Sequence, residues 1–193
     1  MARNLTESQP RRVIVGMTGA SGAVYGIRAL EVLRALDIET HLIMSKAGAL
    51  TVDYETDLQP ADVKAKASVS YTISDVGAAV ASGSFRTLGM IIAPCSMRTL
   101  AEIASGVTSS LLTRAADVVL KERRRLVLLV RETPLTTIHL KNMLAVSEAG
   151  GVIAPLVPAF YAKPEDLNAM VDHTVGRMLD LFDMDTGTVN RWT

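Results

Sequence analysis

The chain has 193 residues, 49% of them apolar, with 20 basic and 20 acidic side chains and a formal net charge of zero. This length favours one domain, and the charge balance argues against a nucleic-acid-binding or membrane-surface protein held by bulk electrostatics. A single cysteine excludes an internal disulfide framework and fits a cytoplasmic location, and no apolar run predicts a membrane span. We expect the polar residues 1–10 to be a flexible leader and residues 11–193 to form a single domain.

Short β-branched runs alternate with helical patterns along the chain. Strands are predicted at residues 12–17, 40–44, 90–93, 126–130 and 152–154, and helices at residues 23–36, 46–52, 99–104, 110–121, 137–149 and 164–182. In the last helix, Pro164 is expected at the first helical position, with Glu165 and Asp166 in the first turn. The alternation predicts a three-layer α/β fold with a doubly wound parallel sheet, whose ligand crevice lies beyond the carboxyl ends of the strands.

The junction between the first strand and the first helix is where a phosphorylated ligand is expected. An apolar strand gives way there to small residues and then to a helix whose free backbone N–H groups can bind an anion. The glycines stand at positions 16, 19, 22 and 26, so the dinucleotide spacing G-x-G-x-x-G is absent and NAD is not predicted. Ser21 is interpreted in two compatible ways, as a ligand contact and as the cap of the following helix.

The ends of the later strands add hydroxyl groups and charges to the same crevice. Ser45 follows the second strand, and residues 94–99 follow the strand at 90–93. Cys95 is interpreted as a buried packing residue, because no histidine lies near it in the sequence. Arg131 ends the strand at 126–130, where a cation favours a phosphate or a carboxylate. Glu132 is either the ion-pair partner of Arg131 or an acid–base group.

Four further side chains are candidates for the site. Arg114 and Lys121 are two helical turns apart and so share one helix face. Tyr161 lies in a loop stiffened by prolines, where it either packs as part of a lid or donates a hydrogen bond to a ligand. Glu55 either caps a helix or faces the site. The three histidines, His41, His139 and His173, have no metal-type ligand at usable spacing, so no metal site is predicted.

Taken in order, these segments resemble the UbiX-type flavin prenyltransferases. The motifs that match are GMTGASG at 16–22, MSK at 44–46, ETD at 55–57, PCS at 94–96, RAADV at 114–118, RETPL at 131–135, PAFY at 158–161 and RW at 191–192. The resemblance covers about residues 12–192 and implies a flavodoxin-like, Rossmann-type domain that binds FMN. It also implies transfer of a dimethylallyl group from dimethylallyl phosphate to N5 and C6 of reduced FMN, without a metal. The expected partners are further copies of the chain, typically in a homododecamer, and a UbiD-type decarboxylase that uses the prenylated FMN.

The resemblance also implies a role for each matching side chain. The FMN contacts would be Gly19, Ala20, Ser21, Ser45, Ser96, Met97, Arg98, Thr99 and Arg131, and the isoprenyl phosphate contacts would be Arg114, Lys121, Arg131, Tyr161 and Arg177. The catalytic group would comprise Ser21 and Glu55 beside flavin N5, Lys121 at the phosphate, Glu132 in proton transfer and Trp192 in the prenyl pocket. Several cations and donors around a departing phosphate would take the place of a metal ion.

Two other functions fit the same fold. An FMN-dependent cysteinyl decarboxylase would carry a catalytic histidine before the central strand, but residues 68–88 contain none. A non-catalytic flavin carrier would leave Lys121, Arg131, Tyr161 and Arg177 without a task. In an oligomer with shared sites, Tyr161, Arg177 and Trp192 are the candidates to reach across an interface.

Overall fold

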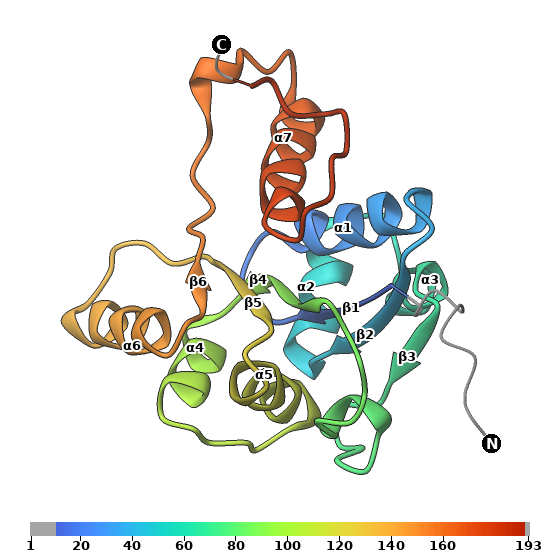
Figure 1. Ribbon diagram of the computed structural model, residues 1–193. Coiled ribbons are helices and arrows are strands. Elements are labelled where there is room, and N and C mark those ends of the chain that lie inside the picture. Colours follow the sequence, from blue (N-terminus) through green and yellow to red (C-terminus); the bar gives the residue numbers. More distant parts are fainter. Residues whose placement is uncertain (1–10, 192–193) are drawn as a thin grey trace.

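The computed structural model describes residues 11–191, and the strands in this range form one six-stranded parallel sheet (Figure 1). The strands are β1 (Arg12–Met17), β2 (Glu39–Met44), β3 (Val69–Tyr71), β4 (Gly89–Cys95), β5 (Arg125–Val130) and β6 (Val152–Ile153). Their order is β3-β2-β1-β4-β5-β6, the Rossmann order, which confirms the predicted fold class. The direction of winding reverses between β1 and β4, and open α/β sheets bind ligands at such a switch point.

Helices cover both faces of the sheet (Figure 1). One face carries α1 (Ala23–Ala35), α2 (Lys46–Glu55), α3 (Pro60–Lys66) and α7 (Leu167–Asp180). The other face carries α4 (Met97–Ala104), α5 (Leu111–Lys121) and α6 (Thr137–Glu148), with the short 3₁₀ turn η1 (Ala79–Ala81). A second 3₁₀ turn, η2 (Phe160–Ala162), lies between β6 and α7 and stands away from the sheet.

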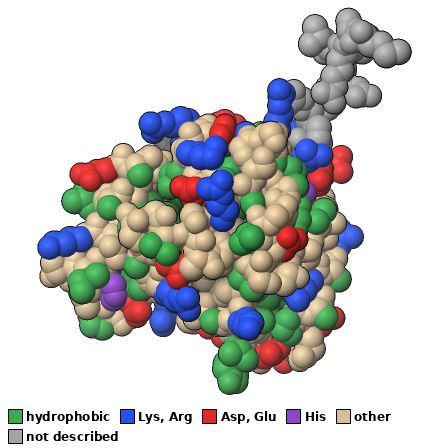
Figure 2. Space-filling view, turned by 90° about the horizontal axis from the view of Figure 1, so that it is seen from below, with side chains coloured by type: hydrophobic (Ala, Val, Ile, Leu, Met, Phe, Trp, Pro, Cys, Tyr) green, Lys and Arg blue, Asp and Glu red, His purple; other side chains and the backbone are tan. Residues whose placement is uncertain are grey.

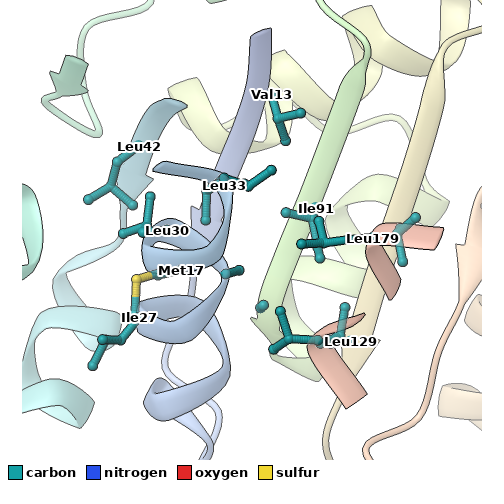
Figure 3. Close-up of a cluster of buried hydrophobic side chains, with 14 of the residues drawn as sticks. Val13, Met17, Ile27, Leu30, Leu33, Leu42, Ile91, Leu129 and Leu179 are labelled. Carbon is teal, nitrogen blue, oxygen red and sulfur yellow. The ribbon is translucent and has the colours of Figure 1, made fainter. Parts of the chain in front are cut away.

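Alternate strand residues supply two separate cores. Val13 of β1 belongs to the same buried cluster as Leu30 and Leu33 of α1 and Leu179 of α7, all labelled in Figure 3. The neighbouring Ile14 points to the opposite face and joins the core that α5 covers. Because both faces are buried, each central strand is a nearly continuous apolar run, which is why the sequence pattern identified these strands.

Two short elements at one edge of the sheet were not predicted. Strand β3 has three residues and, among the described strands, pairs with β2 at the edge of the sheet. Helix α3 has seven residues, too few to show helical periodicity, and its sequence signals lie at its ends: Pro60 and Asp62 in the first turn and Lys64 and Lys66 in the last. Short edge elements bury little apolar surface, so their sequences carry little pattern.

Several predicted boundaries were wrong by a few residues. Strand β4 continues through Pro94 to Cys95, because a register irregularity between Ile92 and Cys95 accommodates a residue that has no N–H to donate. Helix α4 begins at Met97, so the second half of the predicted 94–99 loop is a capped helix start. Helix α7 begins at Leu167 with Asp166 as its N-cap, so Pro164, Glu165 and Asp166 precede the helix instead of forming its first turn.

The remaining features of the molecule are its surface charge and its chain ends. Figure 2 shows one face, on which basic and acidic side chains are interspersed. Within residues 11–191, no helix is long and apolar enough to cross a membrane. The expected leader at 1–10 and Trp192 lie outside the described residues, so the division into a leader and a domain stays a prediction.

Candidate active site

A cavity of about 430 Å³ lies at the carboxyl ends of the strands beside the switch point. Thr18 and Gly19 line it from the end of β1, Ser45 from the end of β2, and Ser96 and Thr99 from the end of β4. This volume is in the range of small-molecule sites. Three strand ends that the sequence assigned to one crevice therefore meet there.

Three helix N-termini converge on this cavity. Ser45 caps α2 by accepting from the Gly48 N–H at 2.9 Å, and Ser96 caps α4 through the Thr99 N–H at 3.4 Å. Ser110, which also lines the cavity, caps α5. Each helix N-terminus stabilises an anion by about 0.3–1 kcal/mol, so the three together form a site for a phosphate group.

The rest of the lining includes apolar surface and residues that sequence reasoning missed. Ile73 and Leu112 give the cavity apolar surface suited to a flat ring. Sequence reasoning placed Ser110 at a helix start but not in the site, because the approach of α5 to the strand ends depends on the fold. Glu102 also lines the cavity and holds two neighbours, Arg98 at 2.9 Å and Ser109 at 2.8 Å.

Thr18 joins two of the loops that form the cavity. Its side chain is buried, its hydroxyl donates to the Pro94 carbonyl at 2.8 Å, and it accepts from the Ser96 N–H at 2.8 Å. The loop after β4 is therefore fixed to the end of β1 by the Thr18 side chain, together with a backbone hydrogen bond from the Thr18 N–H to the Pro94 carbonyl at 3.3 Å. In the sequence, Thr18 was part of the matching motif, but it was given no role.

Glu55, the last residue of α2, caps the start of α1. Its carboxylate accepts from the Gly22 N–H at 2.8 Å and from the Ala23 N–H at 2.9 Å. Gly22 has a φ of 110°, in the left-handed region that favours glycine, and it makes no side-chain cap itself. The interpretation of Ser21 as the helix cap was wrong, because a carboxylate from another helix already satisfies these donors.

The same carboxylate links Ser21 to Arg131. Burial raises the pKa of Glu55, but hydrogen bonds from Ser21 and the two backbone N–H groups, together with the charge of Arg131, bring that pKa below its ordinary value. Ser21, Glu55 and Arg131 thus form a polar group that joins the start of α1 and the end of α2 to the end of β5. Glu55 both caps a helix and belongs to the candidate site.

Of the two interpretations made for Cys95 and Glu132, the structure confirms the first and corrects part of the second. Cys95 is fully buried, and burial raises the pKa of its thiol, which confirms a packing role. Glu132 accepts from the Thr133 N–H at 3.0 Å, and the described residues show no ion pair between Glu132 and Arg131. The ion-pair interpretation of Glu132 was therefore wrong, and its acid–base role stays a prediction. No cluster of three metal-type ligands occurs within residues 11–191.

The structure divides the predicted FMN contacts into two groups. The cavity lining includes Gly19, Ser45, Ser96, Arg98 and Thr99. Ser21 and Arg131 interact instead with Glu55. Ala20, next to Ser21 in the chain, is buried, and Met97 packs on the second core.

The predicted phosphate contacts do not meet within one chain. Arg114 and Lys121 lie on α5, where they pair with Asp117 and Glu122. Tyr161 contacts His173 of α7 at 3.3 Å, and Arg177 follows one turn later on that helix, paired with Asp180 at 2.6 Å. Helices α5 and α7 cover opposite faces of the sheet.

Lys121 is also at the wrong end of the sheet to join Arg131. It ends α5 next to the start of β5, whereas Arg131 follows the end of β5. Six residues of strand separate these two ends, a span of about 20 Å. A site that uses both cations therefore needs more than one copy of the chain.

Comparison with known proteins identifies the family. Residues 1–191 match the family model described as Flavoprotein. The chain is 54% identical over 182 residues to the flavin prenyltransferase UbiX of Neisseria meningitidis serogroup B, covering 94% of this chain and 96% of the relative.

Two solved structures are similar over nearly their whole length. One is AnUbiX (PadA1) in complex with FMN and dimethylallyl pyrophosphate, at 57% identity and a TM-score of 0.94, covering 96% of this chain and 98% of that one. The other is the dodecameric FMN-dependent UbiX-like decarboxylase of Escherichia coli O157:H7, at 50% identity and a TM-score of 0.92, covering 94% and 99%. The chain belongs to the Flavoprotein family and, within it, to the UbiX-type flavin prenyltransferases.

Proposed function

We propose that this chain transfers a dimethylallyl group from dimethylallyl phosphate to N5 and C6 of reduced FMN. The observation that carries the proposal is the cavity at the switch point, where three helix N-termini converge. Its support is the likeness to AnUbiX, whose structure holds FMN and dimethylallyl pyrophosphate. Reduced FMN would supply the nucleophilic ring atoms, and the protein would bind, orient and protonate the groups around them.

The cavity has the chemistry that FMN needs. The helix starts capped by Ser45, Ser96 and Ser110 would hold the FMN phosphate, and Ile73 and Leu112 would contact the flavin ring. Ser21 and Glu55, with Arg131 beside them, would orient the reactive edge of the flavin. Thr18 would keep the loops after β1 and β4 at a fixed separation.

The isoprenyl phosphate would be held by cations and by a phenol. Loss of a phosphate from an allylic carbon develops charge, and preorganised donors stabilise that charge without a metal ion. We assign this task to two groups of side chains. Arg131, Tyr161 and Arg177 form one group, and Arg114 and Lys121 form the other. Glu132 would move the proton lost from the flavin ring, and Trp192 would line the prenyl pocket.

Because α5 and α7 cover opposite faces, we propose that neighbouring copies complete each site. The monomer surface supports self-association: Ile138 and Leu144 of α6 are 69% and 58% exposed, and Val157 and Phe160 are 68% and 73% exposed. The E. coli relative is dodecameric, and a homododecamer is the assembly we propose. The prenylated FMN would pass to a UbiD-type decarboxylase in the cytoplasm.

The test is an anaerobic incubation of the protein with reduced FMN and dimethylallyl phosphate, followed by mass spectrometry of the flavin. We expect a flavin heavier by one C5 prenyl unit, and a parallel incubation with the diphosphate compares the two donors. Unchanged FMN on a folded, flavin-loaded protein would support the flavin-carrier alternative and refute the proposal. Loss of CO₂ from a cysteinyl peptide, without prenylation, would instead indicate the cysteinyl decarboxylase.

A further inference from the structure

His173 of α7 is a buried polar residue with one unexplained atom. The residue is 5% exposed, and its Nε2 lies 3.3 Å from the Tyr161 hydroxyl. The two rings meet edge to face, with centroids 5.6 Å apart and planes at 83°. Its Nδ1 is buried and has no hydrogen-bond partner among residues 11–191. A buried polar atom without a partner requires an explanation.

The unpartnered Nδ1 favours one protonation state of the ring. A doubly protonated ring would bury a charge with an unpaired N–H, and burial of an unpaired charge is costly. A neutral ring with its hydrogen on Nδ1 would bury an orphaned N–H, which folded proteins rarely do. The neutral ring with its hydrogen on Nε2 leaves only a lone pair unpartnered. In this form, His173 donates to the Tyr161 oxygen.

We propose that His173 is a positioning residue for Tyr161 in the prenyl transfer. Its Nε2–H donates to the phenol oxygen, so the phenol uses its own hydrogen as the donor to the substrate phosphate. The inference rests on the proposed function, which places Tyr161 at that phosphate. His173 itself touches neither the flavin nor the substrate.

Tyr161 belongs to η2, in a segment that projects from the fold. The segment from β6 to η2 extends away from the sheet before the chain returns along α7 (Figure 1). Val157 and Phe160 in this segment are largely exposed and add little packing. The Ala162 carbonyl accepts from the Asn190 side chain at 2.9 Å, which holds the backbone next to Tyr161. A donor held before the substrate arrives avoids an ordering cost when the substrate binds.

Two amide variants distinguish the effect of a hydrogen-bond donor at the Nε2 position from the effect of side-chain volume. In His173→Gln the amide nitrogen can reach the place of Nε2, whereas in His173→Asn it reaches only the place of Nδ1. We expect His173→Asn to raise the KM for dimethylallyl phosphate by up to about tenfold, the upper end of the loss expected for one neutral hydrogen bond. His173→Gln should stay within about twofold of the unmodified protein, and FMN affinity should be unchanged in both. Equal KM values for the two variants would overturn the proposal.

A double-variant cycle tests whether His173 acts through Tyr161. In a Tyr161→Phe background, His173→Asn should cause no further rise in KM. A rise as large as that in the unmodified background would show that His173 acts by another route and would refute the inference.

A spectroscopic readout does not depend on activity. In solid-state NMR of the oligomer with ¹⁵N-labelled histidine, the His173 signals, assigned by their loss in His173→Asn, should show a protonated Nε2 and an unprotonated Nδ1. A protonated Nδ1 would refute the inference even if the enzyme prenylates FMN. The predicted tautomer in a protein that makes no prenylated FMN would support the anchor and refute only the proposed function.

Discussion

Single side chains hold the backbone of the candidate site in place. Thr18 joins the loops after β1 and β4, and Glu55 joins the end of α2 to the start of α1. The sequence predicted a role for Glu55, because this acidic residue belongs to one of the matching motifs. Thr18 was given no role, because its partners at Pro94 and Ser96 are more than 70 residues away in the chain. Contacts of this kind are visible only after folding.

Replacing Thr18 with valine should weaken both the fold and FMN binding. Valine has nearly the same shape but leaves the half-buried Ser96 N–H without its acceptor, at a cost of about 1–3 kcal/mol. We expect thermal unfolding at a lower temperature and a raised Kd for FMN, measured by flavin fluorescence. Thr18→Ser is the matched control and should retain most of the thermal stability and most of the affinity for FMN. Equal behaviour of the valine and serine variants would show that the hydroxyl does not hold the loops.

Glu55→Gln should reduce stability at neutral pH but not in acid. The folded-state pKa of Glu55 is lowered, so its charge stabilises the fold above the ordinary glutamate pKa, 4.5, and that stabilisation is lost as the pH falls through the lower folded value. We expect a difference of about 0.5–1 kcal/mol at pH 7 that shrinks at pH 3, measured by urea unfolding at one protein concentration. Glu148→Gln, at the exposed end of α6, serves as the control. A difference that grows in acid would contradict the assignment.

At the scale of elements, the sequence predicted what depends on long apolar patterns. Helices and strands that cover or form the centre of the sheet were located to within a few residues. The edge elements α3 and β3 were not, because they are short and bury little. Pro94 ended the predicted strand early, since the irregularity that accommodates it depends on pairing with β5.

The packing of α1 on β4 leaves no room for a side chain at Gly26. A Cβ there would lie 2.2 Å from the Ala93 carbonyl oxygen, although alanine is the better helix former by about 1 kcal/mol. We expect Gly26→Ala to destabilise the protein by about 1–3 kcal/mol in urea unfolding, because the crowding outweighs the propensity. Gly77→Ala, where the nearest atom lies at 3.7 Å, should be nearly neutral. A stabilised Gly26→Ala protein would mean that the helix and the strand are not packed this closely.

At the scale of the whole molecule, one chain carries the cavity proposed for the flavin, but it does not bring the predicted phosphate contacts together. The sequence resemblance named the residues, yet it could not place them, because their separation depends on which sheet face each helix covers. Arg114 and Lys121 lie on α5, whereas Tyr161 and Arg177 are associated with α7 on the other face. Neighbouring copies are therefore part of the proposed site.

Mixed oligomers test this assembly most directly. Lys121→Ala and Arg131→Ala should each abolish most prenylation of reduced FMN, because each removes one cation from the phosphate. If the two residues of a site come from different copies, oligomers co-assembled from equal amounts of both variants contain both intact residues in about a quarter of their sites. We predict that the mixture regains about a quarter of the unmodified activity, measured as prenylated FMN by mass spectrometry. A mixture no more active than the two variants alone would contradict a site shared between copies.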